Sequence, residues 1–217
     1  MGSAIIFSAH GSKFLQHAVY CAEQARYNIT GTDIIIHTTD TVHSGREGVF
    51  DRVIYQQNIW KKTFTYRIHG MLKALQYYNK LIYVDNDVII LDQKFTNILD
   101  VLETHDVAVA HAKHRHSPGD IAYSIIPECY PEFNCGVIGY TRNSKSMLEN
   151  WLSIYNNDVY KHPAHHRREM HDQGAFREAV YNSGLKVCTL PEHYNCKSDE
   201  IINNIYAWHH KNAIKKI

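Results

Sequence analysis

The sequence has few cysteines and no CxxC pair. Its cysteines are odd in number and scattered along the chain, which is typical neither of a disulfide framework nor of a zinc finger. We therefore expect reduced thiols in a cytoplasmic protein, because reducing compartments keep cysteines unpaired. The five residues are Cys21, Cys129, Cys135, Cys188 and Cys196.

Long hydrophobic runs and a strong net charge are also missing. No apolar stretch approaches the roughly 18 residues that a membrane-spanning helix needs, so we expect no transmembrane segment. The opening MGSAIIFSAHGSKF lacks the basic start and long apolar core of a signal peptide. The formal net charge is +1. A nearly neutral chain has no overall field that attracts polyanions, so we expect no nucleic acid partner.

What the sequence does contain is the composition of a globular domain. Its 217 residues are 44% hydrophobic and 21% charged, which is enough material for a buried core. We find no internal repeat, low-complexity tract or linker, so we expect one compact domain over residues 1–217. Histidine is frequent, with 16 copies, and its placement matters because imidazole titrates near neutral pH and binds metals.

The first half of the chain alternates strand-like and helix-like patterns. Helical spacing of apolar residues begins at Lys13 and again at Ile68. Strands are expected at 4–10, 34–39, 52–56 and 81–84. This order predicts an α/β fold with a mixed, mainly parallel sheet flanked by helices on both faces. In such sheets, ligands bind beyond the carboxyl ends of the strands.

The second half is less regular. Helical spacing is found over 147–155 and again after Asp172, which is a candidate N-cap for that helix. Strands are expected at 106–112, 133–141, 185–191 and 205–210.

The segment KLIYVDNDVIILD, residues 80–92, places two carboxylates within an apolar run. Residues i and i+2 of an extended segment point the same way, so Asp85 and Asp87 can aim at one point. Carboxylate oxygens suit Mg²⁺ or Mn²⁺, which would hold a diphosphate. The alternative is an ordinary turn after a strand, where Asp and Asn are common. Carboxylates in apolar surroundings also need a counter-charge.

Several segments, taken in order, resemble one known family. LIYVDNDVIIL resembles the DxD segment of GT-A fold nucleotide-sugar glycosyltransferases, and most of all the glycogenin and lipopolysaccharide galactosyltransferase family. Four later segments are also similar to that family's motifs: FNCGVIGY (133–140), HDQGAF (171–176), LPEHYNC (190–196) and AWHHKN (207–212). The resemblance implies a Rossmann-like GT-A domain, with a nucleotide-binding half over 1–100 and a donor-sugar and acceptor half over 101–217.

The resemblance implies a metal site made of Asp85, Asp87 and a late histidine. The metal would be Mn²⁺ or Mg²⁺, acting as a Lewis acid on the leaving nucleoside diphosphate. Because side chains alternate along a strand, only one of His209 and His210 can face the metal. The family's pattern favours His209 by position, and His210 stays open.

The resemblance also implies residues that bind the donor. Arg67 would contact the diphosphate or the donor sugar, a role that suits the guanidinium fork, with Lys61 and Lys62 as nearby alternatives. Asn134 would bind sugar hydroxyls. Gly136 would allow a ligand to approach the strand closely.

Two further groups of residues are implied. Asp172 would hold donor-sugar hydroxyls, and Gln173 would lie near the anomeric carbon, so these two are the candidate catalytic residues. The candidate nucleoside-side residues are Ser8, Ala9 and His10 at the end of the first strand, with Asn86, which is expected to face away between the two aspartates.

The leading hypothesis is a metal-dependent glycosyltransferase. It would move a sugar from a nucleoside diphosphate donor, expected to be UDP-linked, to a hydroxyl of a carbohydrate or glycoconjugate acceptor, with retention. One alternative is a nucleotidyltransferase acting on sugar phosphates, but SAHGSKF (8–14) is poor in glycine and lysine for that class. Another is a non-catalytic histidine-rich metal-binding module, whose spacing fits no closed zinc site well. Its candidate ligands are His111, His114 and His116, or His162, His165, His166 and His171.

The end of the chain departs from the family's pattern. After His210 it reads KNAIKKI, without the glycine and the proline-tryptophan pair of the family's late motif. Lys211, Lys215 and Lys216 are candidates to supply the positive charge instead. The chain is also shorter than typical members, and is therefore compatible with one domain of a larger multidomain enzyme.

Overall fold

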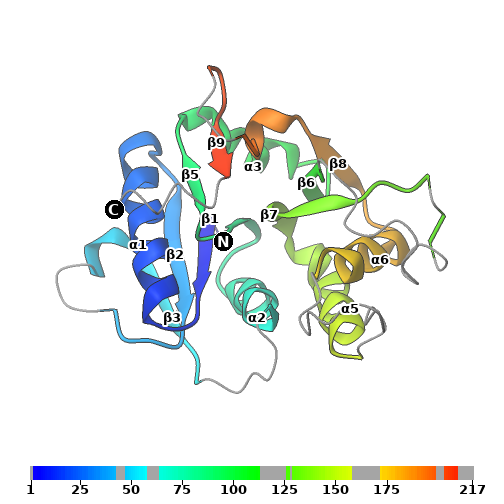
Figure 1. Cartoon of the computed structure of the whole chain (residues 1–217), viewed down its shortest axis with the longest axis horizontal. Coiled ribbons are helices and arrows are strands. Elements are labelled where there is room, and N and C mark those ends of the chain that lie inside the picture. The colour runs from blue at the N-terminus through cyan, green and yellow to red at the C-terminus, as the bar shows by residue number, and fades with distance from the viewer. Residues whose placement is uncertain are drawn as a thin grey trace.

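The protein is described by a computed structural model over residues 2–42, 47–57, 64–112, 126–127, 129–157, 172–198 and 203–209. Within these ranges, seven strands form one sheet in the spatial order β3-β2-β1-β4-β7-β6-β8 (Figure 1). The strands are β1 Ser3–Ala9, β2 Asp33–Thr38, β3 Arg52–Tyr55, β4 Lys80–Val84, β6 Val107–His111, β7 Phe133–Thr141 and β8 Val187–Leu190.

The sheet is mixed and mainly parallel, as the alternation of elements predicted. Strand β1 is parallel to both β2 and β4, and β2 is parallel to β3. Strand β7 is antiparallel to β4 and to β6, whereas β6 and β8 are again parallel. The parallel part therefore brings the carboxyl ends of β1 and β4 to the same edge.

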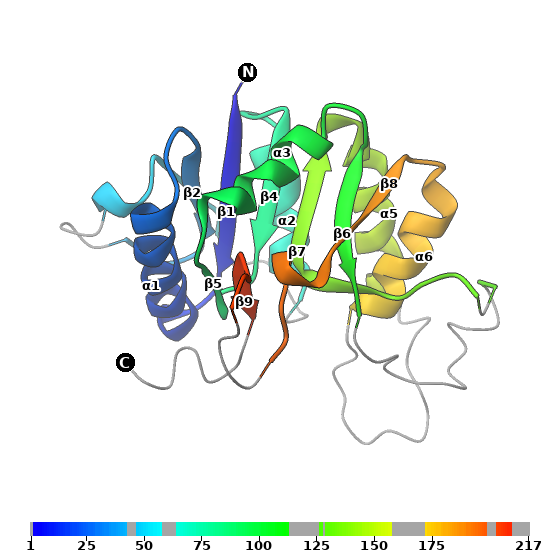
Figure 2. The same ribbon diagram turned by 90° about the horizontal axis from the view of Figure 1, so that it is seen from above.

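Helices cover both faces of the sheet (Figure 2). One face carries α1 Ser12–Asn28 and the short α3 Ile98–Val101, and the other carries α2 Thr65–Ala74, α5 Lys145–Asn156 and α6 Gln173–Ser183. Short 3₁₀ turns connect some of these elements: η1 Glu47–Val49, η2 Gln93–Asn97, η3 Arg142–Ser144 and η4 Glu192–Tyr194. None of the helices in the described part of the chain is long and apolar enough to cross a membrane.

Two hydrophobic cores lie on the two faces of the sheet because side chains alternate along each strand. In β1, Ile5 and Phe7 belong to the core under α1, whereas Ala4 and Ile6 belong to the core under α2. Both sets are fully buried. A strand covered on both faces must be apolar throughout, which explains the continuous hydrophobic runs in the sequence.

A second, two-stranded sheet lies at the edge where ligands are expected. Strand β5, Val88–Ile90, pairs antiparallel with β9, Ala207–His209, and Val88 lies opposite His209. The expected strand over 205–210 is thus confirmed for 207–209, although it pairs with β5 and not with the main sheet. This pairing places a residue from the end of the sequence beside the Asp85–Asp87 segment.

Candidate functional site

The two aspartates follow β4 in a tight turn. Asn86 and Asp87 occupy the turn, and the Val88 N–H donates to the Asp85 carbonyl at 3.1 Å. The expectation that this segment is extended is therefore wrong, because β4 ends at Val84 and the chain reverses into β5. The Asp85 N–H donates to the Gly136 carbonyl at 2.8 Å, which fixes the start of the turn against β7.

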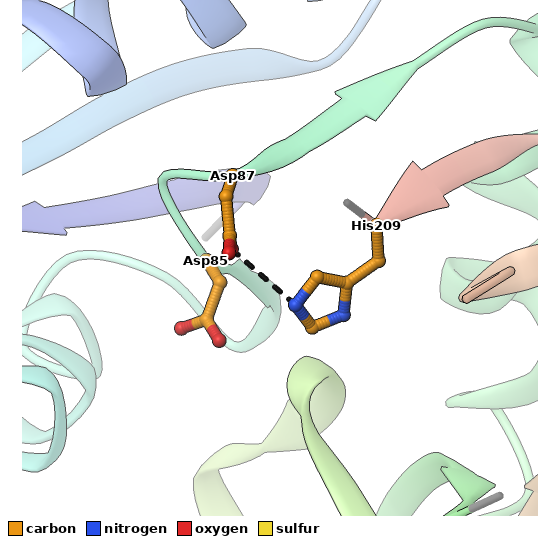
Figure 3. Close-up of side chains that lie close together, drawn as sticks. All are labelled: Asp85, Asp87 and His209. Carbon is orange, nitrogen blue, oxygen red and sulfur yellow. Dashed lines mark ion pairs between the residues drawn. The ribbon is translucent and has the colours of Figure 1, made fainter. Parts of the chain in front are cut away.

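The turn nevertheless brings both carboxylates together with His209. Asp85, Asp87 and His209 each offer one ligand atom, and these atoms lie within 4.8 Å of one another. The Nε2 atom of His209 is 3.3 Å from Oδ1 of Asp87 (Figure 3). The structure thus clusters the three residues that the sequence assigned to a metal. His210, the alternative ligand, lies outside the described residues.

The protonation of Asp87 reflects its partners. Burial raises the pKa of the Asp87 carboxyl, but the hydrogen bond and charge of His209, with further contributions from Lys197 and Arg67, lower the pKa overall. Carboxylate oxygens suit both Mn²⁺ and Mg²⁺, and the added imidazole nitrogen favours the transition metal Mn²⁺. The donor set of this site therefore fits the cation that the resemblance implied.

Two residues assigned to donor binding lie near the histidine: Gly136 is next to the ring, and Asn134 is linked to it through Asn195. The Oδ1 atom of Asn134 accepts from the Gly136 N–H at 2.9 Å and from Nδ2 of Asn195 at 2.9 Å. The Oδ1 atom of Asn195 is in turn 2.8 Å from Nδ1 of His209. A Cβ on Gly136 would stand 2.2 Å from Cε1 of His209. The glycine therefore makes room for the imidazole ring.

Arg67 lies buried between two carboxylates. Its Nη1 is 3.4 Å from Oδ1 of Asp85, and its Nε is 3.4 Å from Oδ2 of Asp172. Nη1 also donates to the Cys135 carbonyl at 3.3 Å. Burial lowers the pKa of Arg67, but Asp172 and Asp85 more than reverse this, so the guanidinium keeps its charge. Arg67 is thus the counter-charge that the carboxylates need.

Asp172 stands at the start of α6, but its side chain makes no capping hydrogen bond. The candidate N-cap role is therefore wrong for the side chain, which faces Arg67. Its backbone carbonyl accepts from Nε1 of Trp151 at 3.1 Å. Gln173 is buried, and its Nε2 donates to Oε1 of Glu132 at 3.2 Å.

The end of β1 carries the remaining predicted residues. Ser8 and Ala9 are buried, and Nδ1 of His10 is 2.9 Å from the Thr39 hydroxyl. Nδ2 of Asn86 donates to the Ser8 carbonyl at 2.8 Å. Asn86 thus faces away from the carboxylates, as expected. Its Oδ1 and the Ser8 hydroxyl are buried without a hydrogen-bond partner among the described residues.

A cavity of about 340 Å³ opens beside Asn134 and Asn195. It is bounded by the carboxyl end of β6, the start of β7 and the segment after β8. Its lining residues are Ala110, His111, Ala112, Asn134, Thr189, Leu190, Glu192, Asn195 and Lys197. Since Asn134 and Asn195 line it, the cavity adjoins the metal-ligand cluster.

Two residues of the site were not singled out from the sequence. Tyr83 donates from its hydroxyl to Oδ1 of Asp85 at 2.7 Å, and Asn195 contacts His209. The position of Tyr83 two residues before Asp85 was a usable signal, because alternate residues share a face.

Several predicted residues lie outside the described part of the chain. Among the ligands of the alternative histidine-rich module, His111 alone is described. The predicted residues that lie outside the described ranges, from this module and from the other candidate sites, are Lys61, Lys62, His114, His116, His162, His165, His166, His171, His210, Lys211, Lys215 and Lys216.

The fold is that of the nucleotide-diphospho-sugar transferases, the GT-A class of glycosyltransferase. Solved structures of this class match the chain over nearly its whole length, but at sequence identities that establish the fold alone. No protein-family model matches the sequence, and no curated protein sequence matches it.

Three solved structures illustrate the likeness. The glycosyltransferase GlyE of Streptococcus pneumoniae TIGR4 is 12% identical, with a TM-score of 0.63, over 95% of this chain and 54% of that one. The galactosyltransferase LgtC, in complex with donor and acceptor sugar analogues, is 11% identical (TM-score 0.60; 96% and 87%). Mouse xyloside xylosyltransferase 1 is 11% identical (0.61; 97% and 98%). The chain spans about half the length of GlyE.

Proposed function

We propose that the protein is a metal-dependent glycosyltransferase that moves a sugar from a nucleoside diphosphate donor to a hydroxyl of a carbohydrate or glycoconjugate acceptor. The observation that carries the proposal is the cluster of Asp85, Asp87 and His209 at the carboxyl edge of the sheet. Open α/β sheets bind ligands at that edge. The GT-A fold, shared with galactosyl- and xylosyltransferases, supports sugar transfer.

In this proposal Asp85, Asp87 and His209 hold Mn²⁺ or Mg²⁺. Such a cation supplies Lewis-acid stabilisation of the charge on the leaving diphosphate. Arg67 holds the Asp85 side chain in place through their ion pair. A cation held by the two aspartates and His209 would balance the negative charge of the aspartates. Without the cation, the aspartates would repel a negatively charged diphosphate.

The donor would extend from the end of β1 across the turn. His10, with the backbone of Ser8 and Ala9, would meet the nucleoside, which we propose to be uridine. Asn86 holds the Ser8 carbonyl and so keeps the end of β1 against the turn. The sugar would then lie toward Gln173 at the start of α6.

The acceptor would enter from the cavity beside Asn134 and Asn195. Its lining includes hydroxyl, amide and charged side chains, which can hydrogen-bond sugar hydroxyls. We propose retention of configuration, since an inverting enzyme needs a general base at the acceptor. The candidate catalytic carboxylate, Asp172, is buried and faces Arg67, which does not suit that task.

The nucleotidyltransferase alternative is less well supported by the loop after β1. Such enzymes need backbone amides at that turn to bind phosphate. Here the Gly11 N–H donates to Oδ2 of Asp40 at 2.8 Å. A carboxylate of the protein therefore already occupies the amide at the start of α1.

The wider setting of the enzyme is also a proposal. The described cysteines are free, and we propose a cytoplasmic location on that basis. Because the chain spans about half of GlyE, we also propose that it acts as the catalytic domain of a larger enzyme.

The test is binding and hydrolysis of UDP-sugars with and without Mn²⁺. We expect Mn²⁺-dependent binding in the wild type and a loss of at least about 100-fold in Mn²⁺ affinity in Asp87→Asn, since even the neighbours of metal ligands are worth 10–100-fold. Asp100→Asn, on the exposed surface of α3, is the matched control and should change neither. The proposal fails if UDP-sugars do not bind in the presence of Mn²⁺, or if Asp87→Asn behaves like the control.

A further inference from the structure

Two buried asparagines form a chain of hydrogen bonds behind the histidine. Asn134 is 4% exposed and Asn195 is 5% exposed. An amide side chain buried to this degree must have its oxygen and nitrogen matched to the right partners, because an unmatched group loses a hydrogen bond. The chain of contacts runs from the Gly136 N–H through Asn134 and Asn195 to His209.

The direction of each hydrogen bond in this chain follows from its first member. A backbone N–H can only donate, so the Asn134 atom facing Gly136 must be its oxygen. That oxygen also faces Asn195, whose contacting atom must therefore be the NH₂ group. The other end of the Asn195 amide is then its oxygen. An oxygen accepts, so Nδ1 of His209 must carry a proton.

This assignment decides what the other ring nitrogen can do. In a neutral imidazole one nitrogen carries a proton and the other carries a lone pair. With the proton on Nδ1, a neutral His209 has its lone pair on Nε2, the atom 3.3 Å from Asp87, whereas the charged ring that lowers the pKa of Asp87 carries a proton on both nitrogens. The lone pair therefore faces the carboxylates, as a metal ligand requires.

The backbone keeps Asn195 and His209 side by side. The His209 N–H donates to the Cys196 carbonyl at 2.9 Å, and the Cys196 N–H donates to the Ala207 carbonyl at 3.0 Å. Gly136 also lies close to the ring, because a Cβ there would stand 2.6 Å from Nδ1 of His209. The glycine and the Asn195 amide therefore both lie next to Nδ1.

We propose that Asn195 is a positioning residue for the metal site. Supported by Asn134 and Gly136, it holds His209 as the Nδ1–H tautomer with Nε2 directed at Asp85 and Asp87. The proposal rests on the proposed metal-dependent function for its purpose, but the tautomer itself is a property of the metal-free protein. It also gives Asn134 and Gly136 a task in holding the histidine.

The first test is the tautomer of His209 in the metal-free protein, measured by ¹⁵N NMR of the imidazole nitrogens. The resonances are assigned by their loss in His209→Gln. At a pH at which the imidazole is neutral, we expect the Nδ1–H form in the wild type and a mixture of both forms in Asn195→Ala. A wild-type ring protonated on Nε2 alone overturns the proposal, even if Asn195→Ala does not fold.

The second test is Mn²⁺ affinity, measured by the electron paramagnetic resonance signal of free Mn²⁺. We expect Asn195→Ala to bind Mn²⁺ 10–100-fold more weakly, the loss typical for partners that orient a metal ligand. Asn143→Ala removes an amide that bonds Asp106 away from the site, and should bind Mn²⁺ like the wild type.

The outcomes separate this inference from the proposed function. If Asn195→Ala keeps both the tautomer and the Mn²⁺ affinity, the positioning role is wrong and the metal site stands. If the wild type does not bind Mn²⁺ at all, the metal-dependent function is wrong. The tautomer measurement then still decides whether Asn195 orients the ring.

Discussion

The two aspartates of the turn after β4 have very different surroundings. Asp85 belongs to an arginine side, formed by Arg67, Asp85 and Asp172, where the side chains of Arg67 and Asp172 are 7% and 4% exposed. Asp87 belongs to a histidine side, formed by Asp87 and His209, and its own side chain is 31% exposed. Although only one residue separates them, Asp85 is thus paired with an arginine and Asp87 with a histidine.

The difference shows how the protein tolerates a cluster of negative charge. On the arginine side, the protein supplies its own counter-charge, so Asp85 is held in place whether or not a cation is bound. On the histidine side, the partner is an imidazole that is charged only when protonated. A bound cation is therefore expected to matter most on the histidine side, and substitutions can separate the two.

The largest effect is expected from breaking the arginine side with Arg67→Met. Removing one partner of a buried ion pair leaves uncompensated charge, here on Asp85 and Asp172, and typically costs about 3–5 kcal/mol. Urea denaturation of the metal-free protein measures the loss. Arg26→Met is the matched control, because the Arg26–Asp51 pair is partly exposed and should cost about 1 kcal/mol or less.

A second variant tests the reason for that loss. In Arg67→Met combined with Asp172→Asn, one of the two stranded charges is gone, so the total loss should be smaller than the sum of the single losses. Additive losses would show that Arg67 and Asp172 do not interact.

The histidine side is broken most directly by Gly136→Ala. The added methyl group would stand 2.2 Å from the imidazole, so the ring must move away from the carboxylates. We expect Mn²⁺ affinity to fall about 100-fold, or about 2.7 kcal/mol, as measured by calorimetric titration. Gly48→Ala, where a Cβ meets nothing within 4 Å, should leave the affinity unchanged.

A smaller effect is expected from Tyr83→Phe. This removes the hydrogen bond from the buried Tyr83 hydroxyl to Asp85 and should lower stability by about 1.5 kcal/mol. Tyr78→Phe removes the same kind of bond, to Asp33 at 2.7 Å, and should cost a similar amount. Mn²⁺ affinity distinguishes them, since the Tyr83 variant alone should weaken it. Equal Mn²⁺ affinity in both would contradict a role for Tyr83 in placing Asp85.

The smallest effect is expected in the dependence of stability on pH, measured in the metal-free protein. Burial raises the pKa of Asp172 above its ordinary value, despite the opposing charge of Arg67. In the folded protein, Asp172 therefore stays protonated to a higher pH than in the unfolded chain. As a result, the free energy of unfolding falls as the pH rises from the unfolded to the folded pKa of Asp172. The pKa of Asp87 is lowered, so its contribution is present above the unfolded pKa and is lost as the pH falls through the folded one.

Opposite changes therefore follow from neutralising each residue. Asp172→Asn should make the loss of stability on acidification steeper, and Asp87→Asn should make it shallower. Urea denaturation between about pH 3 and pH 6 measures both slopes. If both substitutions change the slope of stability against pH in the same direction, the arginine side and the histidine side do not differ in this respect.

The fold was largely predictable because its signals are local. Apolar runs such as 34–39 and 81–84, separated by helical spacing, indicate buried parallel strands whatever the rest of the chain does. The pairing of β5 with β9 was missed, since neither strand shows in its own residues which partner it will take. The turn at 85–87 was mistaken for extended chain because the apolar run continues on both sides of it.

The metal ligands of the candidate site were predicted better than the residues that hold them in place. Asp85, Asp87 and His209 were placed by resemblance, and the structure brings them together. Asn195 could not be paired with His209 from the sequence, because only the fold brings their side chains together. The cap expected from Asp172 is wrong because a buried arginine competes for the same carboxylate, and a local pattern does not show Arg67. The other assigned roles stay predictions.

Because strand β9 supplies His209, the order of synthesis decides when the metal site is complete. The two aspartates are synthesised well before His209, which follows Asp85 by 124 residues. A nascent chain that stops before β9 would carry the carboxylate pair without its imidazole. Tight metal binding is therefore expected to begin only after β9 has been made, by which time every strand of the seven-stranded sheet has already been synthesised.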